Sequence, residues 1–324
     1  MPRGVLSGAL RALGVVFGVI TLTFVLLHLA PGDPVDRLLG PAATALQRDA
    51  TRHALGLDQP LATQYLAWLG RAVRGDFGTS LVQGRPIATM LAEAWPATAL
   101  LVFLSLGASY VLGIALGLFQ ANIRRGGVDA AISAGSVALN AIPGYWLGLV
   151  MVMVFTWWLR WLPAFGAAGL DAGFLGPWSR FADRLRHLAL PLLTLTLIGM
   201  GGVTRFVRAS LGELRDAPFL AVARAKGISR WRVAVRHQLR NGLVPVITLL
   251  GLSLPAFFSG TVFVEAIFAW PGVGQVLVQG VEGRDYPVVM AAVTVSAVLV
   301  VAGNLLADVL AELMDPRVRV RTNE

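Results

Sequence analysis

Residues Asp216 to Pro245 have the sequence DAPFLAVARAKGISRWRVAVRHQLRNGLVP, a basic block that lies between two long apolar runs. Its pattern predicts a helix, a turn and a second helix. Asp216 is expected to cap the first helix, with Pro218 in its first turn and Gly227 at its end. Ser229 is expected to cap the second helix, which leads back into the next apolar run.

The composition indicates a membrane protein. Of the 324 residues, 56% are hydrophobic and only 14% are charged, which is too apolar for an ordinary soluble domain. The net charge of +9 collects at the ends of apolar runs, and this placement argues against nucleic acid as a partner. The chain has no cysteine, which excludes disulfides, thiolate metal sites and cysteine nucleophiles.

Six apolar stretches are long enough to cross a bilayer, which takes about 20 residues of helix. They are residues 12–30, 98–120, 139–159, 188–204, 243–264 and 286–307. The first is expected to be a retained anchor, because it is longer than the apolar part of a signal peptide and no small-x-small cleavage site follows it. Pro143 is expected to kink the third stretch. The sequence therefore predicts an all-α membrane protein with six transmembrane helices.

The placement of basic residues predicts the orientation of these helices. Residues 205–240 carry nine basic and two acidic side chains, a net charge of +7, whereas residues 265–285 carry one basic and three acidic, a net charge of −2. The N-terminus and the Arg124–Arg125 turn are also basic. Both termini and the loop at residues 205–242 are therefore expected in the cytoplasm. The loop between the third and fourth stretches carries four arginines against this trend.

The chain is expected to have four parts. Residues 1–30 hold an N-terminal segment and the first spanning helix, 31–96 a periplasmic segment, 97–316 the transmembrane core (helices two to six) with its cytoplasmic loop at 205–242, and 317–324 a cytoplasmic tail. Within the periplasmic segment, Leu61, Tyr65, Leu69 and Val73 recur every four residues and predict a helix that ends by Gly75. This segment is interpreted either as a structural cap or as a landing surface for a solute-delivering partner.

Small residues recur at four-residue spacing in the first two spanning stretches. Gly14 and Gly18 form one such pair, and Ser109, Gly113 and Gly117 form a series of three. Small side chains at this spacing let helix backbones approach closely. We expect ordinary packing within the chain from them, in preference to a contact between subunits.

A cluster of aromatic, proline and glycine residues after the fifth stretch predicts a tight outer turn. The candidates for this turn, or for a gate built on it, are Glu265, Trp270, Pro271 and Gly272. Trp270 is suited to the interface between membrane and water.

The sequence indicates no catalytic site, no metal ligands and no bound cofactor. No ionisable residue lies at the middle of a spanning stretch, which argues against ion coupling within the chain. A P-loop requires Gly-Lys-Ser/Thr, and the sole lysine, Lys226, is followed by Gly227 and Ile228. None of the four histidines belongs to His-Glu-x-x-His, and Gly-x-Ser-x-Gly is absent, so a hydrolase is disfavoured.

The basic block has two possible roles, a lipid-facing loop or a docking arm. An anionic inner leaflet would favour each basic residue near its surface by roughly 1 kcal/mol. That role explains the arginines but not the proline-to-glycine helix boundaries. Nor does it explain the small apolar run Leu220, Ala221, Val222 and Ala223, which suits insertion into a cleft. We therefore favour docking of this block to a partner protein.

Several motifs resemble those of bacterial ABC importer permeases, specifically the dipeptide, oligopeptide and nickel branch. The arm Ala223-Arg224-Ala225-Lys226-Gly227, with Arg236-His237-Gln238-Leu239-Arg240-Asn241 and Pro245 after it, is similar to the signature loop of that family. Further similar motifs are Pro31-Gly32-Asp33-Pro34, Leu55-Gly56-Leu57-Asp58-Gln59-Pro60, Asp76-Phe77-Gly78-Thr79-Ser80, Trp270-Pro271-Gly272-Val273-Gly274, Arg284-Asp285-Tyr286-Pro287 and Asp315-Pro316-Arg317. The family motif begins Glu-Ala-Ala where this sequence has Ala221, Val222 and Ala223, so the glutamate contact of the family is missing.

The resemblance implies a type I permease bundle whose cytoplasmic coupling helix contacts an ATPase through Ala223, Arg224, Ala225, Lys226 and Gly227. Its implied partners are a second permease in a heterodimer, two cytoplasmic ATPase subunits that bind the ATP, and a periplasmic or lipid-anchored solute-binding protein. The implied function is import of short peptides across the bacterial inner membrane, without enzyme activity in this chain. Import of nickel or a metal chelate is the alternative within the family. An ATP-independent channel or carrier and a membrane scaffold are the alternatives outside it.

Overall fold

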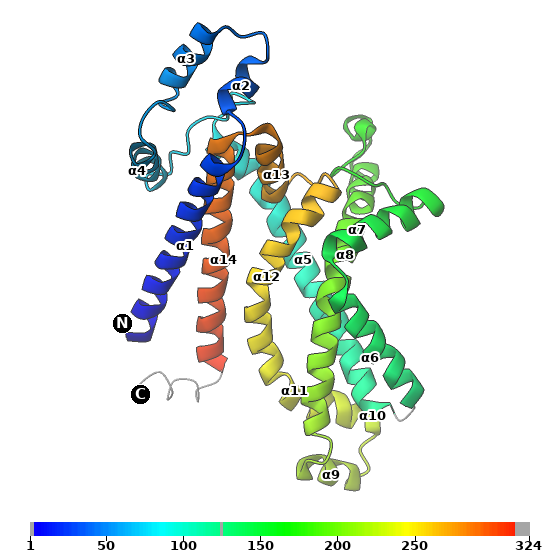
Figure 1. The fold of residues 1–324 in the computed structure, drawn as a ribbon. Coiled ribbons are helices and arrows are strands. Elements are labelled where there is room, and N and C mark those ends of the chain that lie inside the picture. Colours follow the sequence, from blue (N-terminus) through cyan, green and yellow to red (C-terminus); the bar gives the residue numbers. More distant parts are fainter. Residues whose placement is uncertain (1–2, 124–125, 315–324) are drawn as a thin grey trace. The chain divides into compact units, whose positions relative to one another are not determined.

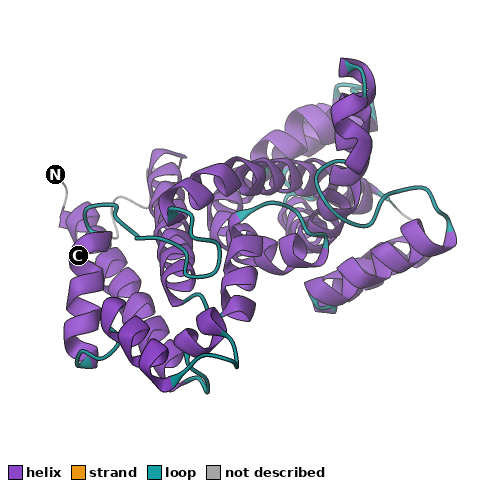
Figure 2. Ribbon diagram, turned by 90° about the horizontal axis from the view of Figure 1, so that it is seen from above, coloured by secondary structure: helices purple, strands orange, loops and turns teal. Residues whose placement is uncertain are grey.

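The computed structural model describes residues 3–123 and 126–314. The Arg124–Arg125 turn, Asp315-Pro316-Arg317 and the tail that follows lie outside the described residues. Within those ranges the regular structure is helical, with no strand (Figure 1, Figure 2). Five described helices are long and apolar enough to cross a membrane, and a bent pair makes a sixth span if it is counted as one. The predicted all-α membrane protein is confirmed.

The long helices are α1 (Arg3–Leu29), α5 (Ile87–Asn122), α8 (Pro177–Glu213), α12 (Val244–Ile267) and α14 (Tyr286–Met314). The bent pair is α6 (Gly126–Ala141) and α7 (Gly144–Met151), and a π-helical segment, Val152–Trp158, continues α7. The shorter helices are α2 (Pro34–Leu39), α3 (Ala45–Ala54), α4 (Leu61–Ala72), α9 (Pro218–Ala225), α10 (Arg230–Arg232), α11 (Leu239–Gly242) and α13 (Val273–Gly283). Two further short segments are a 3-10 turn at Leu170–Phe174 and a π-helix at Val233–Gln238.

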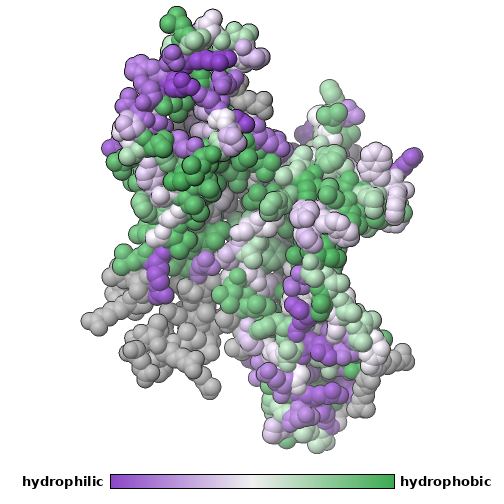
Figure 3. All heavy atoms as spheres, in the orientation of Figure 1, coloured by the Kyte–Doolittle hydropathy of each residue, from purple (hydrophilic) through white to green (hydrophobic). Residues whose placement is uncertain are grey.

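The contacts within the chain form two compact units. The first unit is Met1–Thr98 with Pro271–Val301, and the second is Ala99–Trp270 with Ala302–Glu324. The first unit therefore joins α1 and the periplasmic segment to α13 and most of α14, a grouping that the four-part division of the sequence does not contain. In this unit Figure 3 shows hydrophilic side chains gathered over α2, α3 and α4, and hydrophobic side chains over α1 and α14.

The helix predicted within residues 31–96 is confirmed as α4, which packs on α1. Trp68 of α4 is buried together with Ile20 and Phe24 of α1. The hydroxyl groups of Tyr65 and Thr21 lie 2.7 Å apart. The predicted stripe is only partly inside, because both of its end residues, Leu61 and Val73, are exposed.

A buried aspartate joins two segments of the first unit that are distant in sequence. Asp285 is 2% exposed. One of its carboxylate oxygens accepts from Ser80 Oγ at 2.6 Å and from the Val82 N–H at 3.1 Å, and the other accepts from the Val288 N–H at 3.3 Å. Ser80 and Asp285 are 205 residues apart. This one side chain therefore holds residues 80–82 against the start of α14.

The Asp285→Asn variant is expected to destabilise the folded protein by about 1 to 3 kcal/mol, because the amide places a donor where the carboxylate receives donors in a buried site. The measurement is the thermal unfolding midpoint in detergent. The Asp76→Asn variant is the control, since the Asp76 carboxylate accepts only a local N–H, from Gly78, at an exposed turn. Equal midpoints for the two variants would contradict this account of Asp285.

Gly32 marks a close approach in the same region. Its φ is +115°, and a Cβ atom at this position would overlap the guanidinium group of Arg284. The Tyr286 hydroxyl lies 3.4 Å from the Gly32 carbonyl oxygen, to which it donates. The motifs around Gly32, Ser80 and Asp285, which are far apart in the sequence, thus meet in one place.

The small residues of α5 bring it close to α8 in the second unit. A Cβ atom at Gly113 would lie 2.7 Å from Val203 Cβ, and one at Gly117 would lie 2.8 Å from the Thr204 carbonyl oxygen. Packing of this series within the chain is therefore confirmed. Gly14 and Gly18 differ, because no described atom lies within 4 Å of a Cβ atom built at either position.

The third predicted span is broken at Pro143. Its two parts, α6 and α7, differ in direction by 106°. Pro143 lies at the N-cap of α7 with ψ of 133°, outside the helical range, and it has no N–H to continue the helix. The predicted kink is confirmed, but as a break between two helices and not as a bend within one.

Candidate functional site

The basic block folds into the predicted helical arm. Its first helix is α9, with Pro218 at the first position. Gly227 follows with φ of +76°, and its N–H donates to the Arg224 carbonyl oxygen at 3.0 Å. The Ile228 N–H donates to the Ala223 carbonyl oxygen at 3.3 Å. The returning limb is α10, the π-helix and α11, which together lead into α12.

The predicted cap at Asp216 is wrong, whereas Ser229 has the predicted position but makes no capping hydrogen bond. Ala217, and not Asp216, occupies the N-cap position of α9, where no side chain makes a capping hydrogen bond. Ser229 does occupy the N-cap position of α10, but its hydroxyl makes no capping bond. Pro218 has no N–H, so the first turn of α9 has one fewer donor that needs a cap.

The arm has its own small core. Leu220, Ala223 and Val233 are buried together, with at most 5% of each side chain exposed. Ala223 therefore packs α9 onto the returning limb, and it does not face outward. Arg224, Ala225, Lys226 and Gly227 are exposed, so four of the five predicted coupling residues are available to a partner.

Two apolar residues on the outer face of the arm were not predicted as site residues. Phe219 and Val222 are 40% and 54% exposed, and they lie three residues apart on α9. Leu220 and Ala223 occupy the adjacent face of α9 at the same spacing, and they are buried. The sequence of α9 contains two apolar pairs at a spacing of three residues, and only one of the two pairs can point inward. This repeated spacing was the signal that could have identified an exposed apolar face. The exposed surface of the arm is thus a mixture of basic and apolar side chains.

The returning limb is tied to the end of α8. Gln238 is 3% exposed, and its side-chain amide donates to the Leu211 carbonyl oxygen at 2.8 Å. Ser210 Oγ donates to the Gly242 carbonyl oxygen at 3.0 Å. A Cβ atom at Gly242 would overlap Leu211. The returning limb is therefore held against the end of α8 by close packing and hydrogen bonds.

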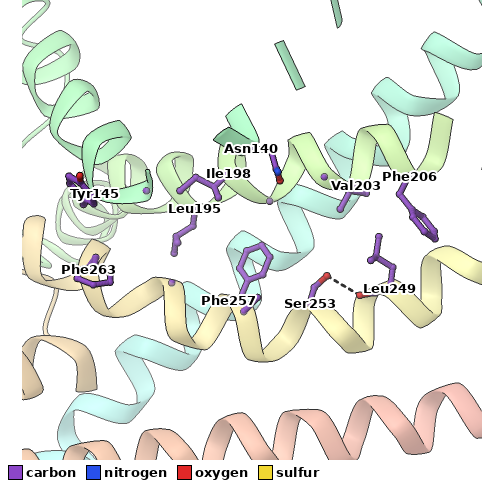
Figure 4. A pocket seen from close by; sticks show the side chains of 15 residues that line it. Asn140, Tyr145, Leu195, Ile198, Val203, Phe206, Leu249, Ser253, Phe257 and Phe263 are labelled. Carbon is purple, nitrogen blue, oxygen red and sulfur yellow. Dashed lines mark hydrogen bonds between the residues drawn. The ribbon is translucent and has the colours of Figure 1, made fainter. Parts of the chain in front are cut away.

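A cavity of about 520 Å³ lies among α6, α7, α8 and α12 (Figure 4). It is mostly apolar, and its side chains include Leu195, Ile198, Phe257 and Phe263. Its polar lining side chains are Asn140, Tyr145 and Ser253, and none of the lining residues is charged. The sequence named no pathway residues, because this lining comes from four helices whose packing is not visible in one chain's periodicity.

The helix α8 takes part in both features. Its residues from Leu195 to Phe206 line the cavity, and Ser210 and Leu211, one turn further on, hold the returning limb of the arm. No break interrupts α8 between Pro177 and Glu213. One continuous helix therefore connects the arm to the wall of the cavity.

The predicted outer turn is present. The Trp270 N–H donates to the Glu265 carbonyl oxygen at 2.9 Å, and Ala269 has φ of +47°. Glu265 and Gly272 are buried and Pro271 is exposed. Trp270 is 5% exposed, so its side chain packs inside the protein, and its place at the membrane interface stays a prediction. A gating role of these four residues stays a prediction.

A histidine–aspartate pair links α3 to the loop before α4. His53 Nδ1 lies 2.6 Å from Asp58 Oδ2. The hydrogen bond to Asp58 raises the pKa of His53, and the same bond lowers the pKa of Asp58. The pair is exposed, so its effect is local.

Raising the pH from roughly 6 to roughly 8 is expected to loosen this link. A raised pKa of His53 stabilises the fold fully below the ordinary value of 6.5, and this stability is lost as the pH rises through the raised value. Hydrogen exchange of the amides from 53 to 58, corrected for intrinsic rates, measures the change. The His53→Gln variant should lack the pH dependence, and an equal dependence in that variant would contradict the assignment.

Two family models match the chain. Residues 113–320 match the model described as "Binding-protein-dependent transport system inner membrane component". Residues 1–102 match the model described as "Binding-prot-dependent transport system membrane comp, N-term". Together the two matches extend over nearly the whole chain.

Curated relatives are similar over their full length. The oligopeptide transport system permease protein AppB of Bacillus subtilis (strain 168) is 38% identical, over 98% of this chain and 99% of that protein. A putative peptide permease protein of Brucella suis biovar 1 (strain 1330) is also 38% identical, over 99% and 100%. The glutathione transport system permease protein GsiC of Escherichia coli (strain K12) is 35% identical, over 96% and 98%.

Proposed function

The chain belongs to the family of binding-protein-dependent transport system inner membrane components, and from this premise we propose that it forms the translocation pathway for short peptides in an ATP-driven importer. The names of its relatives, an oligopeptide, a peptide and a glutathione permease, support peptides as the substrate class. It is a multi-pass inner-membrane protein and a transport subunit, not an enzyme.

The continuity of α8 is the observation that carries the proposal. The cavity is a part of the second unit that can hold an apolar or uncharged group, and the arm is a part that can receive a force. One helix forms a wall of the former and binds the latter through Gln238 and Gly242. A transporter in which movement of the arm opens the pathway requires a structural element, here α8, that contacts both.

The proposed partners follow from the surface of the arm. Phe219, Val222, Arg224 and Lys226 present apolar and basic groups side by side, which suits a groove on a partner protein. We assign that groove to one of two cytoplasmic ATPase subunits, which bind the ATP. A second permease in a heterodimer and an external solute-binding protein complete the proposed importer. The arm and both termini then lie in the cytoplasm, and the periplasmic segment faces the binding protein.

In this mechanism the ATPase subunits close on ATP and displace the arm. The displacement tilts α8 and shifts the balance between inward-open and outward-open forms of the cavity. The uncharged lining offers no fixed partner for the charged ends of a peptide, so the cavity conducts the solute without holding it tightly. Selection among peptides is then left to the binding protein.

Filling the cavity tests its assignment as the pathway. A Cβ atom at Gly260 has Leu195 Cδ2 as its nearest neighbour, at 4.0 Å, so Gly260→Trp projects an indole ring into the cavity without forcing the helices apart. ATP-driven peptide uptake in proteoliposomes of the whole complex is expected to fall by about tenfold or more, since the ring occupies the space of the solute. The quantity of assembled complex should be unchanged.

The matched control is Gly107→Trp, which places the same side chain on α5 at a position with no atom within 4 Å and outside the cavity lining. Its uptake should equal that of the unmodified protein. Normal uptake by the Gly260→Trp variant would show that the solute does not pass through this cavity.

The substrate class is tested by uptake in cells that lack their own peptide importers. Expression of the complete importer should support growth on short peptides as the sole source of a required amino acid. Uptake of nickel without uptake of any peptide would overturn the peptide assignment while leaving the importer intact.

A further inference from the structure

The segment that runs from the last two residues of the π-helix, through the following loop, to the first turns of α8 is unusually aromatic. We call residues 157–187 the aromatic loop. It contains four of the nine tryptophans of the chain, Trp157, Trp158, Trp161 and Trp178. Each of the four side chains is at least 67% exposed. Tryptophans in a folded protein are rarely left in water in such number, so these side chains require an explanation.

The aromatic loop has an ordered conformation. The Arg180 guanidinium donates to the carbonyl oxygens of Ala172, Gly173 and Leu175 at 3.0, 3.1 and 3.2 Å. Asp183 accepts from the Gly169 N–H at 2.8 Å. These bonds fix the 3-10 turn Leu170–Phe174 against the first turns of α8. The turn is therefore ordered, and it exposes the side chains of Leu170 and Phe174, which are 103% and 93% exposed.

The first turns of α8 continue the same surface. Trp178, Phe181 and Leu185 recur at the spacing of one helix face, and all three are at least 49% exposed. The rings of Trp178 and Phe181 stack with their centroids 5.8 Å apart. Arg184 and Arg186 are exposed on the same turns. An apolar stripe bordered by arginines is the pattern of a helix that lies at a membrane surface.

The arginines of this surface have no protein counter-charge. In the part of the chain that the structure describes, no carboxylate forms an ion pair with Arg160, Arg184 or Arg186. A guanidinium group binds phosphate through two parallel hydrogen bonds. The surface also follows the apolar run from Gly144 to Trp158 directly, so it begins where a membrane-embedded segment ends.

We propose that the aromatic loop lies in the interfacial layer of the bilayer, with its apolar side chains at the acyl-chain boundary and Arg160, Arg184 and Arg186 on lipid phosphates. Tryptophan is enriched at this depth because one end of its ring system is apolar and the other donates a hydrogen bond. The loop then anchors the beginning of α8 in the membrane, while the arm moves the other end. If lipid holds the N-terminal end of α8 in place, a displacement of the arm at the other end tilts α8. The helix then changes the shape of the cavity instead of moving as a whole.

This placement also explains why the loop departs from the charge pattern of the other loops. Arg180 keeps its positive charge, but its guanidinium group is held by three backbone carbonyl groups of the turn. The remaining three arginines bind headgroups. The inference does not depend on which side of the membrane the loop occupies.

The chain has no cysteine, so a single introduced cysteine gives a unique label. A nitroxide at Phe174→Cys in the reconstituted full complex is expected to collide more with oxygen, which concentrates in the bilayer, than with a water-soluble nickel chelate. The control is Leu46→Cys on α3, a position that is 81% exposed and hydrophilic in its surroundings. Its label should show the reverse preference. Equal nickel accessibility at the two positions would overturn the inference.

Contact with a protein partner is the competing explanation, and the same label separates it from lipid. A label buried against another subunit is shielded from oxygen and nickel alike, and that result would also overturn the inference. A second variant tests the built turn. Adding Arg180→Gln to Phe174→Cys removes the three hydrogen bonds to the turn and is expected to shift the label toward water. An unchanged preference for oxygen would show that Arg180 does not position the turn.

Discussion

The Gly227→Val variant is expected to insert and assemble normally but to lose ATP-driven uptake. The φ of Gly227 is +76°, a conformation that costs a β-branched residue roughly 1 to 3 kcal/mol. A Cβ atom at this position meets no other atom within 4 Å, so the cost is one of backbone conformation and not of space. The turn between α9 and α10 is expected to relax to another geometry, which separates the arm's outer face from its packed core.

The measurement is peptide uptake and ATP hydrolysis by the same proteoliposomes. Uptake should fall to background while the complex is recovered in normal quantity. Gly227→Asn is the matched variant, since asparagine tolerates the left-handed conformation, and it should retain most uptake. Gly75→Val places the same strain at φ of +77° in the periplasmic segment and should leave coupling intact. Full uptake by Gly227→Val would refute the role of this turn.

The Gly117→Val variant is expected to prevent stable folding of the second unit. The added Cβ would lie 2.7 Å from Val207 Cβ and 2.8 Å from the Thr204 carbonyl oxygen. The carbonyl belongs to the backbone of α8 and cannot rotate away, so α5 and α8 must separate. Overpacking of this kind is expected to cost about 2 to 4 kcal/mol, a large part of the stability of a folded domain.

The yield of monodisperse protein after detergent extraction measures this effect, together with the thermal midpoint of whatever is recovered. The control is Gly107→Val on the same helix, where no atom lies within 4 Å of the new Cβ. That variant should be recovered in normal yield. Equal behaviour of the two variants would show that helix propensity, and not the approach of α5 to α8, decides the outcome.

Local signals in the sequence predicted the arm and the periplasmic helix well. Pro218 and Gly227 mark the limits of α9 because each acts on the backbone of its own residue, without help from distant parts of the chain. The four-residue spacing from Leu61 likewise predicted α4. The caps at Asp216 and Ser229 failed because a capping bond depends on the exact approach angle of the chain, which residue type alone does not determine.

Features that depend on contacts between distant residues could not be predicted. The sequence could not predict which side of α9 is buried. Leu220 and Ala223 pack with Val233, while the similar residues Phe219 and Val222 are exposed. The burial of Trp270 was another such feature, since its environment comes from other segments. The lining of the cavity and the hydrogen bond from Gln238 to the Leu211 carbonyl oxygen also depend on contacts between distant residues. The sequence predicted the position of the break at Pro143 but not the 106° change of direction between α6 and α7.

The central claim is that the outer face of the arm binds an ATPase, and co-purification from the native host tests it most directly. The variant to compare carries Phe219→Asp and Val222→Asp, which charge the outer face and leave the buried Leu220 and Ala223 in place. The account predicts that the unmodified chain brings with it a second permease and a pair of P-loop ATPase subunits, and that the variant retains the permease and loses the ATPases. Recovery of the unmodified chain alone or only as a homo-oligomer, or of ATPases in equal quantity with the variant, would contradict it.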